Sequence, residues 1–378
     1  MIKITYIVLK SIELIVFILV GNILSRTRNS KNYWKVALPA IFVFALVEGL
    51  RYGRMTDYLS YQGIYNSCNT LFMEGLDPLF SIFVFLSKEA GIGFPLFLVI
   101  QSALLIYACL AILEPYRKYA QYALPLFLPL LIMNENLTRW FMACSFLYLA
   151  FVKYRRRKYL LTALYLVAAQ TTHNAVLPLI PLLLLYPLYD KIIVPRSVVL
   201  FLFIGMTLFS NITNATFIVT ISDFLLNNGL ISEEASMAGH LVHAEDLIQG
   251  EYLELGIKQK GLYEKIISLV IWLPIIWYGY VYANDDKMKG FYNIMALSII
   301  LSPLFSQVEL LGRYNMFMNI FSVVIASVYY YKEIHRKRDV RFCLALVSLF
   351  LFMYPAISLI FMRGVNNDML FIWDALPF

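Results

Sequence analysis

Runs of apolar residues that are long enough to cross a bilayer recur along the whole chain. A hydrocarbon core of about 30 Å needs roughly 20 apolar residues in a helix. Apolar residues make up 61% of the 378 residues and charged residues only 15%, which lies outside the balance of soluble globular domains. We therefore predict an all-α polytopic integral membrane protein, in which residues 1–378 form a single transmembrane domain.

Hydropathy predicts about twelve spans, in a range of about ten to twelve that the chain length allows. The first span ends without a small-residue cleavage site, so we expect it to be retained. The apolar stretch from Pro78 to Ser87 is too short to cross, and it predicts a re-entrant or interfacial helix within an outer loop at residues 51–91. The predicted spans are residues 4–24, 35–50, 92–113, 122–135, 137–152, 159–173, 175–189, 197–214, 265–283, 291–306, 311–331 and 342–362.

Lysine and arginine crowd into alternate connections between these spans. By the positive-inside rule those connections are cytoplasmic, so the formal net charge of +7 reports topology and not a nucleic-acid surface. This assignment puts both termini, the loop at 51–91 and a large polar loop at 215–265 on the outer face. The basic connections are residues 26–35, 117–118, 153–158, 191–196, 287–289 and 332–341.

Neither a metal site nor a disulfide framework is predicted, and no cofactor is expected. The four cysteines show no CxxC spacing and no neighbouring histidine. His240 and His243 in the large outer loop form an HxxH pair, but no third ligand stands at a recognisable spacing. Their spacing of three residues places both histidines on one helical face, from which we expect them to approach a substrate. A loop of this length is typical of a lid or a substrate-binding element, and a disordered loop is the alternative.

The first outer loop combines arginines, an aspartate and tyrosines in the segment RYGRMTDYLSYQGIY. Guanidinium groups bind phosphate oxygens in pairs, and tyrosine rings stack on sugars. The alternatives are an aromatic and basic belt at the membrane interface, or a local ion pair between the first arginine and the aspartate. The candidate binding residues are Arg51, Arg54, Tyr58 and Tyr61, and Asp57 is a candidate catalytic proton acceptor.

Three further candidates stand at the predicted outer ends of spans. Arg139 lies one turn into an apolar helix, where an arginine costs about 2.5–3.5 kcal/mol at the centre and less near the interface; snorkelling to headgroups is the alternative. His173 ends a span and suits a proton acceptor or a hydrogen-bonded turn. Arg313 opens another span and suits a pyrophosphate, with Glu309 on a sugar hydroxyl or in an i, i+4 ion pair.

Several short segments together resemble the EpsG family of polysaccharide polymerases, which are similar to Wzy-type O-antigen polymerases. They are RYGRMTDYLSYQGIY, the DPLF element from Asp77 to Phe80, TRWFMA, TTHNA and GRYNMF. The resemblance spans residues from about 45 to 330. One departure is visible, because Trp140 stands where the family tends to have glutamine after the mid-chain arginine. That departure weakens the case for a role of Trp140 but not for a role of Arg139.

The resemblance implies a GT-C-like multi-helix glycosyltransferase in the bacterial inner membrane, with its active face periplasmic. It implies undecaprenyl-pyrophosphate-linked oligosaccharide as donor and acceptor, and a product such as the O-antigen of lipopolysaccharide. A chain-length regulator and a flippase of the same pathway are expected as further partners, besides the lipid bilayer, and no nucleic acid. The matching positions are Arg51, Asp57, Arg139, His173 and Arg313.

The chemistry of such a transfer suggests roles for these residues. Arginines in a low-dielectric site can hold a leaving pyrophosphate without a metal. We expect Arg139 and Arg313 on the pyrophosphate, Arg51 in support, and Asp57 or His173 as proton acceptor. A flippase for the same lipid-linked sugar, an envelope glycan ligase and a structural assembly subunit remain alternatives. A flippase would be expected to bury polar groups near the bilayer midplane and to show related halves.

Overall fold

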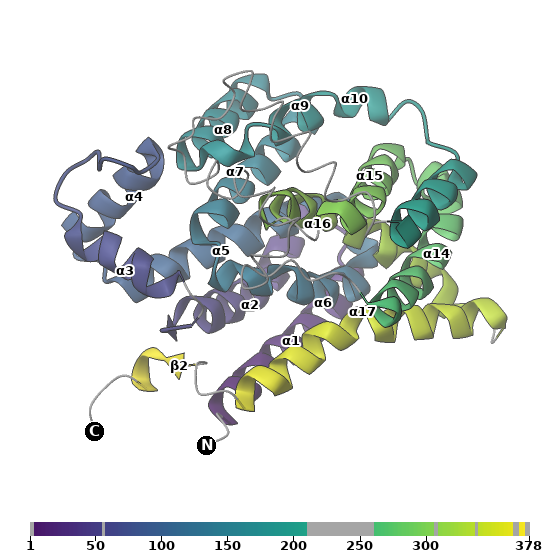
Figure 1. The fold of residues 1–378 in the computed structure, drawn as a ribbon, viewed down its shortest axis with the longest axis horizontal. Helices are drawn as coiled ribbons and strands as arrows, with labels where there is room; N and C mark the ends of the chain where they lie inside the picture. Colours follow the sequence, from purple (N-terminus) through teal and green to yellow (C-terminus); the bar gives the residue numbers. More distant parts are fainter. Residues whose placement is uncertain are drawn as a thin grey trace. The chain divides into compact units, whose positions relative to one another are not determined.

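The computed structural model describes residues 4–54, 57–209, 261–305, 309–336, 339–365 and 370–374. Almost all of them are helical (Figure 1). The chain forms two compact units, Met1–Pro187 with Ala326–Phe378, and Leu188–Ile325. The large loop predicted at residues 215–265 lies almost entirely outside the described residues.

The first unit contains most of the helices and a two-stranded antiparallel pairing, β1 with β2, that joins distant parts of the chain. Its helices are α1 (Ile4–Ser25), α2 (Ser30–Gly49), α3 (Tyr58–Ser67), α4 (Pro78–Glu89), α5 (Phe94–Leu113), α6 (Ala120–Leu131), α7 (Thr138–Arg155), α8 (Tyr159–Thr172), α9 (Leu179–Leu184), α10 (Tyr186–Tyr189, across the unit boundary) and α17 (Val340–Val365). The short elements are β1 (Arg51–Tyr52), β2 (Leu370–Phe371), and the 3-10 helices η1 (Glu114–Tyr119), η2 (Ile132–Glu135), η3 (Asn174–Val176) and η5 (Ile372–Asp374).

The second unit is described over a smaller set of helices. They are Arg196–Phe209, α14 (Leu262–Asp285), α15 (Lys289–Phe305) and α16 (Glu309–Ile334), whose end belongs to the first unit. Asn293 of α15 donates hydrogen bonds to the carbonyls of Tyr189 (2.7 Å) and Ile192 (2.6 Å). Arg196 stacks on the Trp277 ring at 3.8 Å, so side chains of α15 and α14 hold the connection that precedes the helix Arg196–Phe209.

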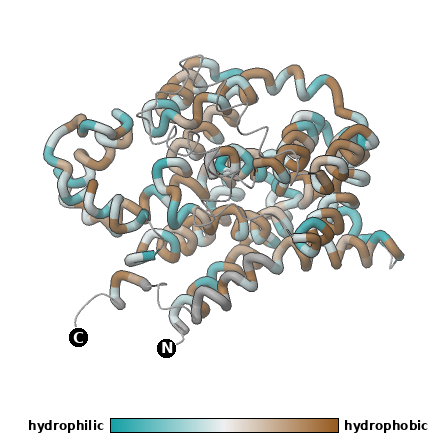
Figure 2. The backbone as a smooth tube through the Cα atoms, viewed as in Figure 1, coloured by the Kyte–Doolittle hydropathy of each residue, from teal (hydrophilic) through white to brown (hydrophobic). Residues whose placement is uncertain are grey.

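The protein is membrane-embedded, as predicted. Among the described residues, four helical stretches are long and apolar enough to cross a bilayer, namely Thr5–Ser25, Phe94–Glu135, Leu262–Asp285 and Leu311–Ile334. Hydrophobic residues run along the helices of both units (Figure 2). On α1 the apolar side chains of Val8, Ile12, Ile15, Leu19 and Ile23 recur every three or four residues and are exposed, which is the stripe that a lipid-facing helix presents.

The predicted positions of the helices agree well with the structure, and two differences have local causes. The stretch 175–189, predicted as one span, is divided among η3, α9 and α10, because prolines remove backbone donors and interrupt helices. Phe94–Glu135 is continuous helix by hydrogen bonding but bends at Tyr116, whose backbone is not helical. The short helix predicted within 78–87 is α4. The total of about twelve spans and the likeness to GT-C enzymes stay predictions.

Close backbone approaches hold the helices of the first unit together. A Cβ atom added to Gly49 of α2 would lie 2.4 Å from Val99 Cα of α5, and one added to Gly21 of α1 would lie 2.6 Å from the Ala120 carbonyl oxygen of α6. Small residues at such crossings are how membrane helices pack without a hydrophobic driving force between them. α1 also contacts α17 (Figure 1).

Basic connections of the first unit gather at one end, which we call the basic end. Arg117 of η1 donates to the carbonyls of Thr27 (3.0 Å) and Arg28 (2.6 Å). Arg156, just after α7, lies 2.7 Å from the carboxylate of Glu114. Lys118 lies 5.2 Å from the Tyr331 ring at the end of α16. Connections that are far apart in sequence therefore meet, as the alternation of charge predicts.

The opposite end of this unit we call the site end. It consists of residues 50–54, 57, 68–77, 132–138, 173–178 and 370–374, which hydrogen bonds and ion pairs connect to one another. The pairing of Arg51 with Phe371 in β1 and β2 brings the last described segment to the first outer loop. The C-terminal segment and the loop after α2 thus lie at the same end, which agrees with the predicted topology.

Candidate functional site

Asp77 joins two of the predicted catalytic residues at the site end. Its Oδ2 atom lies 3.4 Å from Arg139 Nη1 and 3.4 Å from His173 Nδ1. Its Oδ1 atom accepts a hydrogen bond of 3.1 Å from the backbone N–H of Asn174. The three side chains come from the start of α4, the first turn of α7 and the end of α8. Arg139 and His173, which are 34 positions apart in the sequence, therefore share one carboxylate.

Aromatic rings border this group. The Arg139 guanidinium carbon lies 5.9 Å from the centroid of Tyr61 and 5.8 Å from that of Phe80, within the range of cation–π attraction. Trp140 meets the His173 ring edge-on at 5.9 Å. We call Asp77, Arg139, His173, Tyr61 and Phe80 the Asp77 cluster. It combines a cation, an imidazole and aromatic faces, groups that can bind an anion and pack against a ring.

The cluster remains accessible although its helices are packed. The side chain of Arg139 is 26% exposed, that of His173 is 17% exposed and that of Asp77 is 9% exposed. The next residue, Trp140, is fully buried at 1% exposure and fixes the rotation of α7. Successive residues of a helix point about 100° apart, so burying Trp140 turns Arg139 towards the edge of the unit.

Asp77 was missed as a site residue by sequence reasoning, although its DPLF element was noted. An aspartate before a proline at a helix start is typical of an N-cap. Asp77 does occupy the N-cap position of α4, but its side chain makes no capping hydrogen bond there. It faces Arg139 and His173 instead. The available signal was a carboxylate at the start of a short apolar helix.

Arg51 and Arg54, predicted to bind substrate, are buried at 1% and 0% exposure. Arg51 donates to the Glu48 carbonyl (2.6 Å) and to Thr138 Oγ1 (3.0 Å). Burial lowers the pKa of the Arg51 guanidinium, while the carboxylates of Glu135 and Glu48 oppose that effect. Arg51 therefore connects the end of α2 to the start of α7, and the proposed contact of both arginines with substrate stays a prediction.

Arg54 is enclosed on several sides. Its Nη1 atom lies 2.7 Å from Glu135 Oε1, and both side chains are 0% exposed. The guanidinium carbon lies 3.9 Å from the Phe371 ring centroid and 5.0 Å from that of Tyr6. The N-terminal helix, the first outer loop, η2 and the C-terminal strand β2 therefore meet at one buried cation.

A buried charge network extends from this pair into the bundle. Lys10 bonds to Glu48 and lies 3.3 Å from Glu13 and 3.8 Å from Glu135. The sequence analysis did not single out Lys10 or Glu13, although ionisable residues in apolar runs need partners. The network carries three formal positive and three formal negative charges, on Lys10, Arg51, Arg54, Glu13, Glu48 and Glu135.

Uncharged polar groups continue this network to the start of α7. Gln101 Nε2 donates to Asn134 Oδ1 (2.9 Å) and to the Thr138 carbonyl (3.1 Å). Asn134 Nδ2 donates to Ser102 Oγ (3.1 Å). All four residues are buried. These hydrogen bonds hold η2 and Thr138, the first residue of α7, and so they fix the backbone position of the next residue, Arg139.

The remaining candidate residues of the first outer loop, Asp57, Tyr58 and Tyr61, have different surroundings. The backbone N–H of Asp57 donates to Asn136 Oδ1 (3.1 Å), and Asp57 occupies the N-cap position of α3 without a capping hydrogen bond from its side chain. Tyr58 is 2% exposed and packs edge-on against Phe94 at 5.4 Å, so burial raises the pKa of its phenol. Of the two predicted tyrosines, Tyr61 is the one beside Arg139.

The other predicted residues lie in the second unit or outside the described residues. Arg313 is half-buried on α16. Below it, Ser298 Oγ lies 2.6 Å from Asn315 Oδ1 and 2.9 Å from Asn319 Oδ1, a polar contact between α15 and α16. The side chain of Glu309, and His240 and His243 entirely, lie outside the described part of the chain. Within the described ranges, no group of three or more His, Cys, Asp or Glu side chains is arranged to hold a metal ion.

A model of one protein family, described as the EpsG family, matches residues 34–370. The chain belongs to the EpsG family. This confirms the resemblance drawn from the short segments, and the match includes Asp77, Arg139, His173 and Arg313. EpsG-type proteins include Wzy-like polymerases, and membership indicates a polymerase-like role in polysaccharide biosynthesis at the membrane. No curated protein and no solved structure matches the chain.

Proposed function

We propose that this EpsG-family protein polymerises polyprenyl-pyrophosphate-linked oligosaccharide repeat units into O-antigen or a related surface polysaccharide. The observation that carries the proposal is the Asp77 cluster at the site end, in which a partly exposed arginine and a histidine share one carboxylate and aromatic rings border the arginine. Fixed cations and hydrogen-bond donors that face developing charge are the largest source of rate enhancement in many enzymes.

The reaction assigns a role to each member of the cluster. The sugar hydroxyl of the acceptor attacks the anomeric carbon of the donor, the bond to the pyrophosphate oxygen breaks, and its electron pair leaves with the polyprenyl pyrophosphate. Arg139 binds the pyrophosphate, His173 accepts the hydroxyl proton, and Asp77 orients the imidazole and stabilises its charged form. Tyr61 and Phe80 offer faces for a sugar ring.

The contacts of Asp77 support a site that rearranges on binding. Both of its contacts at Oδ2 are 3.4 Å long, longer than a typical charge-assisted hydrogen bond of about 2.7–2.9 Å. Catalytic hydrogen bonds are often long without substrate and shorten when it binds. A pyrophosphate can therefore draw Arg139 away from Asp77 without breaking a buried ion pair.

Other parts of the proposal rest on chemistry and topology. Arg313 supplies a second cation, Arg51 supports the site from within, and Asp57 is the alternative proton acceptor. The basic end is cytoplasmic by the positive-inside rule, so the site end faces the periplasm of a bacterial inner membrane. A GT-C-like arrangement, and a flippase and a chain-length regulator as partners, belong to the same proposal.

An elongation assay tests the function. The full-length protein is supplied with a synthetic polyprenyl-pyrophosphate oligosaccharide and a chelator, without nucleotide sugar. We expect longer lipid-linked glycans from the wild type, and a loss of about 10²-fold or more with Arg139→Ala or Arg313→Ala. Arg157→Gln, at the basic end, is the control and keeps wild-type activity. Unchanged substrate from folded wild-type protein refutes the polymerase.

The buried charge network favours flipping of the same lipid-linked sugar as the second candidate. Glu13 lies about 13 Å along α1 from its first residue, near the middle of a span, and flippases place ionisable groups there. In vesicles, a flippase transfers the fluorescent lipid-linked sugar between leaflets without lengthening it. Transfer without elongation would favour this second function over polymerisation.

A further inference from the structure

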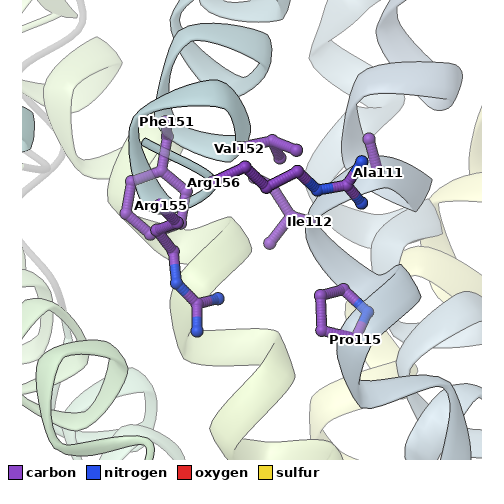
Figure 3. Close-up of a pocket in the computed structure, with 7 residues that line it drawn as sticks. All are labelled: Ala111, Ile112, Pro115, Phe151, Val152, Arg155 and Arg156. Atoms are coloured by element: carbon purple, nitrogen blue, oxygen red, sulfur yellow. The ribbon is translucent and has the colours of Figure 1, made fainter. Parts of the chain in front are cut away.

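A small pocket opens at the basic end, between α5 and α7 of the first unit. Its volume is about 150 Å³. Figure 3 shows the side chains of Arg155 and Arg156 reaching from α7 along the space that faces Ile112 and Pro115. The lining residues are Ala111, Ile112, Pro115, Phe151, Val152, Arg155 and Arg156.

The pocket is apolar inside and cationic at its mouth. Ala111, Ile112 and Phe151 are buried at 5%, 1% and 1% exposure. Arg155 and Arg156 are exposed, and the side chain of Arg156 is 48% exposed. The sequence run KYRRRK marked this connection as cytoplasmic but gave it no further role.

Existing contacts hold both guanidinium groups beside the pocket. Arg155 Nη2 donates to the Tyr116 hydroxyl (2.7 Å), and its guanidinium carbon lies 5.7 Å from the Tyr186 ring centroid. Arg156 Nη2 lies 2.7 Å from Glu114 Oε2. A guanidinium carries five N–H donors in a planar fork, so these contacts orient the groups and leave room for an anion.

We propose that this pocket binds an anionic phospholipid, with the phosphodiester on Arg155 and Arg156 and the first carbons of an acyl chain on the apolar floor. Basic pockets between membrane helices suit anionic headgroups. Each arginine near an anionic lipid surface contributes about 1 kcal/mol to binding. A cavity of about 150 Å³ lined by apolar side chains holds a benzene-sized group, so the floor accommodates a few methylenes.

This site is separate from the Asp77 cluster. Arg139 and Arg155 are 16 residues apart on the same helix, which corresponds to about 24 Å along its axis. A phosphate held at the basic end therefore cannot be the pyrophosphate that reacts at the site end. The proposal goes beyond the proposed function, and its test does not require catalysis.

The test is lipid binding by the purified full-length protein, measured by native mass spectrometry with phosphatidylglycerol or phosphatidylcholine. We expect Arg155→Gln and Arg156→Gln each to weaken phosphatidylglycerol binding roughly fivefold, and the double variant roughly 25-fold. The control, Arg157→Gln, removes the third arginine of the run, which does not line the pocket, and leaves binding within twofold. If the double variant does not fold, the two single variants still test the proposal.

Two further arms distinguish a lipid from a free phosphate. Ala111→Leu fills the apolar floor and keeps both arginines, so it weakens binding of phosphatidylglycerol but not of inorganic phosphate. Equal binding of phosphatidylcholine, wild-type phosphatidylglycerol affinity in the single variants, or competition by inorganic phosphate at the same concentration as the lipid would each overturn the proposal.

Discussion

The Arg54–Glu135 pair offers a prediction whose size follows from burial. The two groups are 2.7 Å apart and both are 0% exposed. At the basic end, Arg156 and Glu114 are also 2.7 Å apart, but the Arg156 side chain is 48% exposed. The substitution of arginine by methionine can therefore be compared in a buried and in a solvent-exposed ion pair of the same length.

Removing one partner of a buried ion pair typically costs about 3–5 kcal/mol, because the other charge is left uncompensated. Lys10 stays 3.8 Å from Glu135, so we expect the lower end, about 3 kcal/mol, for Arg54→Met. An exposed pair contributes about 0–1 kcal/mol, which is the cost expected for Arg156→Met. With about 2–4 °C per kcal/mol, the melting temperature falls by about 6–12 °C in the first variant and by about 4 °C at most in the second.

The assay is thermal unfolding of each purified variant in the same neutral detergent, without added anionic lipid. The single variant Glu135→Leu and the double variant Arg54→Met/Glu135→Leu complete a double-mutant cycle. Replacing a whole buried pair by apolar residues is often neutral, so the double variant should be more stable than the single Arg54→Met. Equal losses for Arg54→Met and Arg156→Met, or additive losses in the double variant, would refute this reasoning.

Three further predictions concern the site and the packing. Asp77→Asn removes the charge that Arg139 and His173 share, and it should lower the elongation rate by about 10–100-fold, the equivalent of one hydrogen bond to a charged group. The control is Glu74→Gln, which removes an exposed carboxylate and should leave the elongation rate unchanged. Gly49→Ala brings a methyl group into the α5 backbone and should cost about 1–3 kcal/mol in thermal unfolding, while Gly63→Ala, with open space around it, should cost nothing or stabilise α3. Arg51→Ala should lower the yield and melting temperature of the protein, and a variant of normal stability with only a raised KM would contradict its buried role.

The arrangement of helices at the two ends could be predicted because hydropathy and charge act through simple rules. The basic connections at 26–35, 117–118 and 153–158 were predicted to share a side, and η1 contacts both the first and the third of them. Arg139 and His173 were predicted to act together, and they meet at one carboxylate. Arginine in an apolar helix start is a strong signal, because its cost requires a partner or a function.

The direction of individual side chains could not be predicted. Arg51 and Arg54 look from the sequence like Arg139, yet they are buried, because their partners, the Glu48 carbonyl oxygen of α2 and the Glu135 carboxylate of η2, come from other parts of the chain. Asp77 lies 62 positions from Arg139 and 96 from His173, so no local pattern links the three. Such contacts depend on how α4, α7 and α8 pack, which sequence periodicity does not determine.

The central claim is that the Asp77 cluster holds the pyrophosphate of a lipid-linked substrate, and binding of polyprenyl pyrophosphate to the purified protein tests it most directly. We predict binding by the wild type and by Arg157→Gln, and at least tenfold weaker binding by Arg139→Ala at the same thermal stability. Wild-type affinity in Arg139→Ala, or loss of binding in Arg155→Gln instead, would contradict the claim and move the pyrophosphate away from the site end.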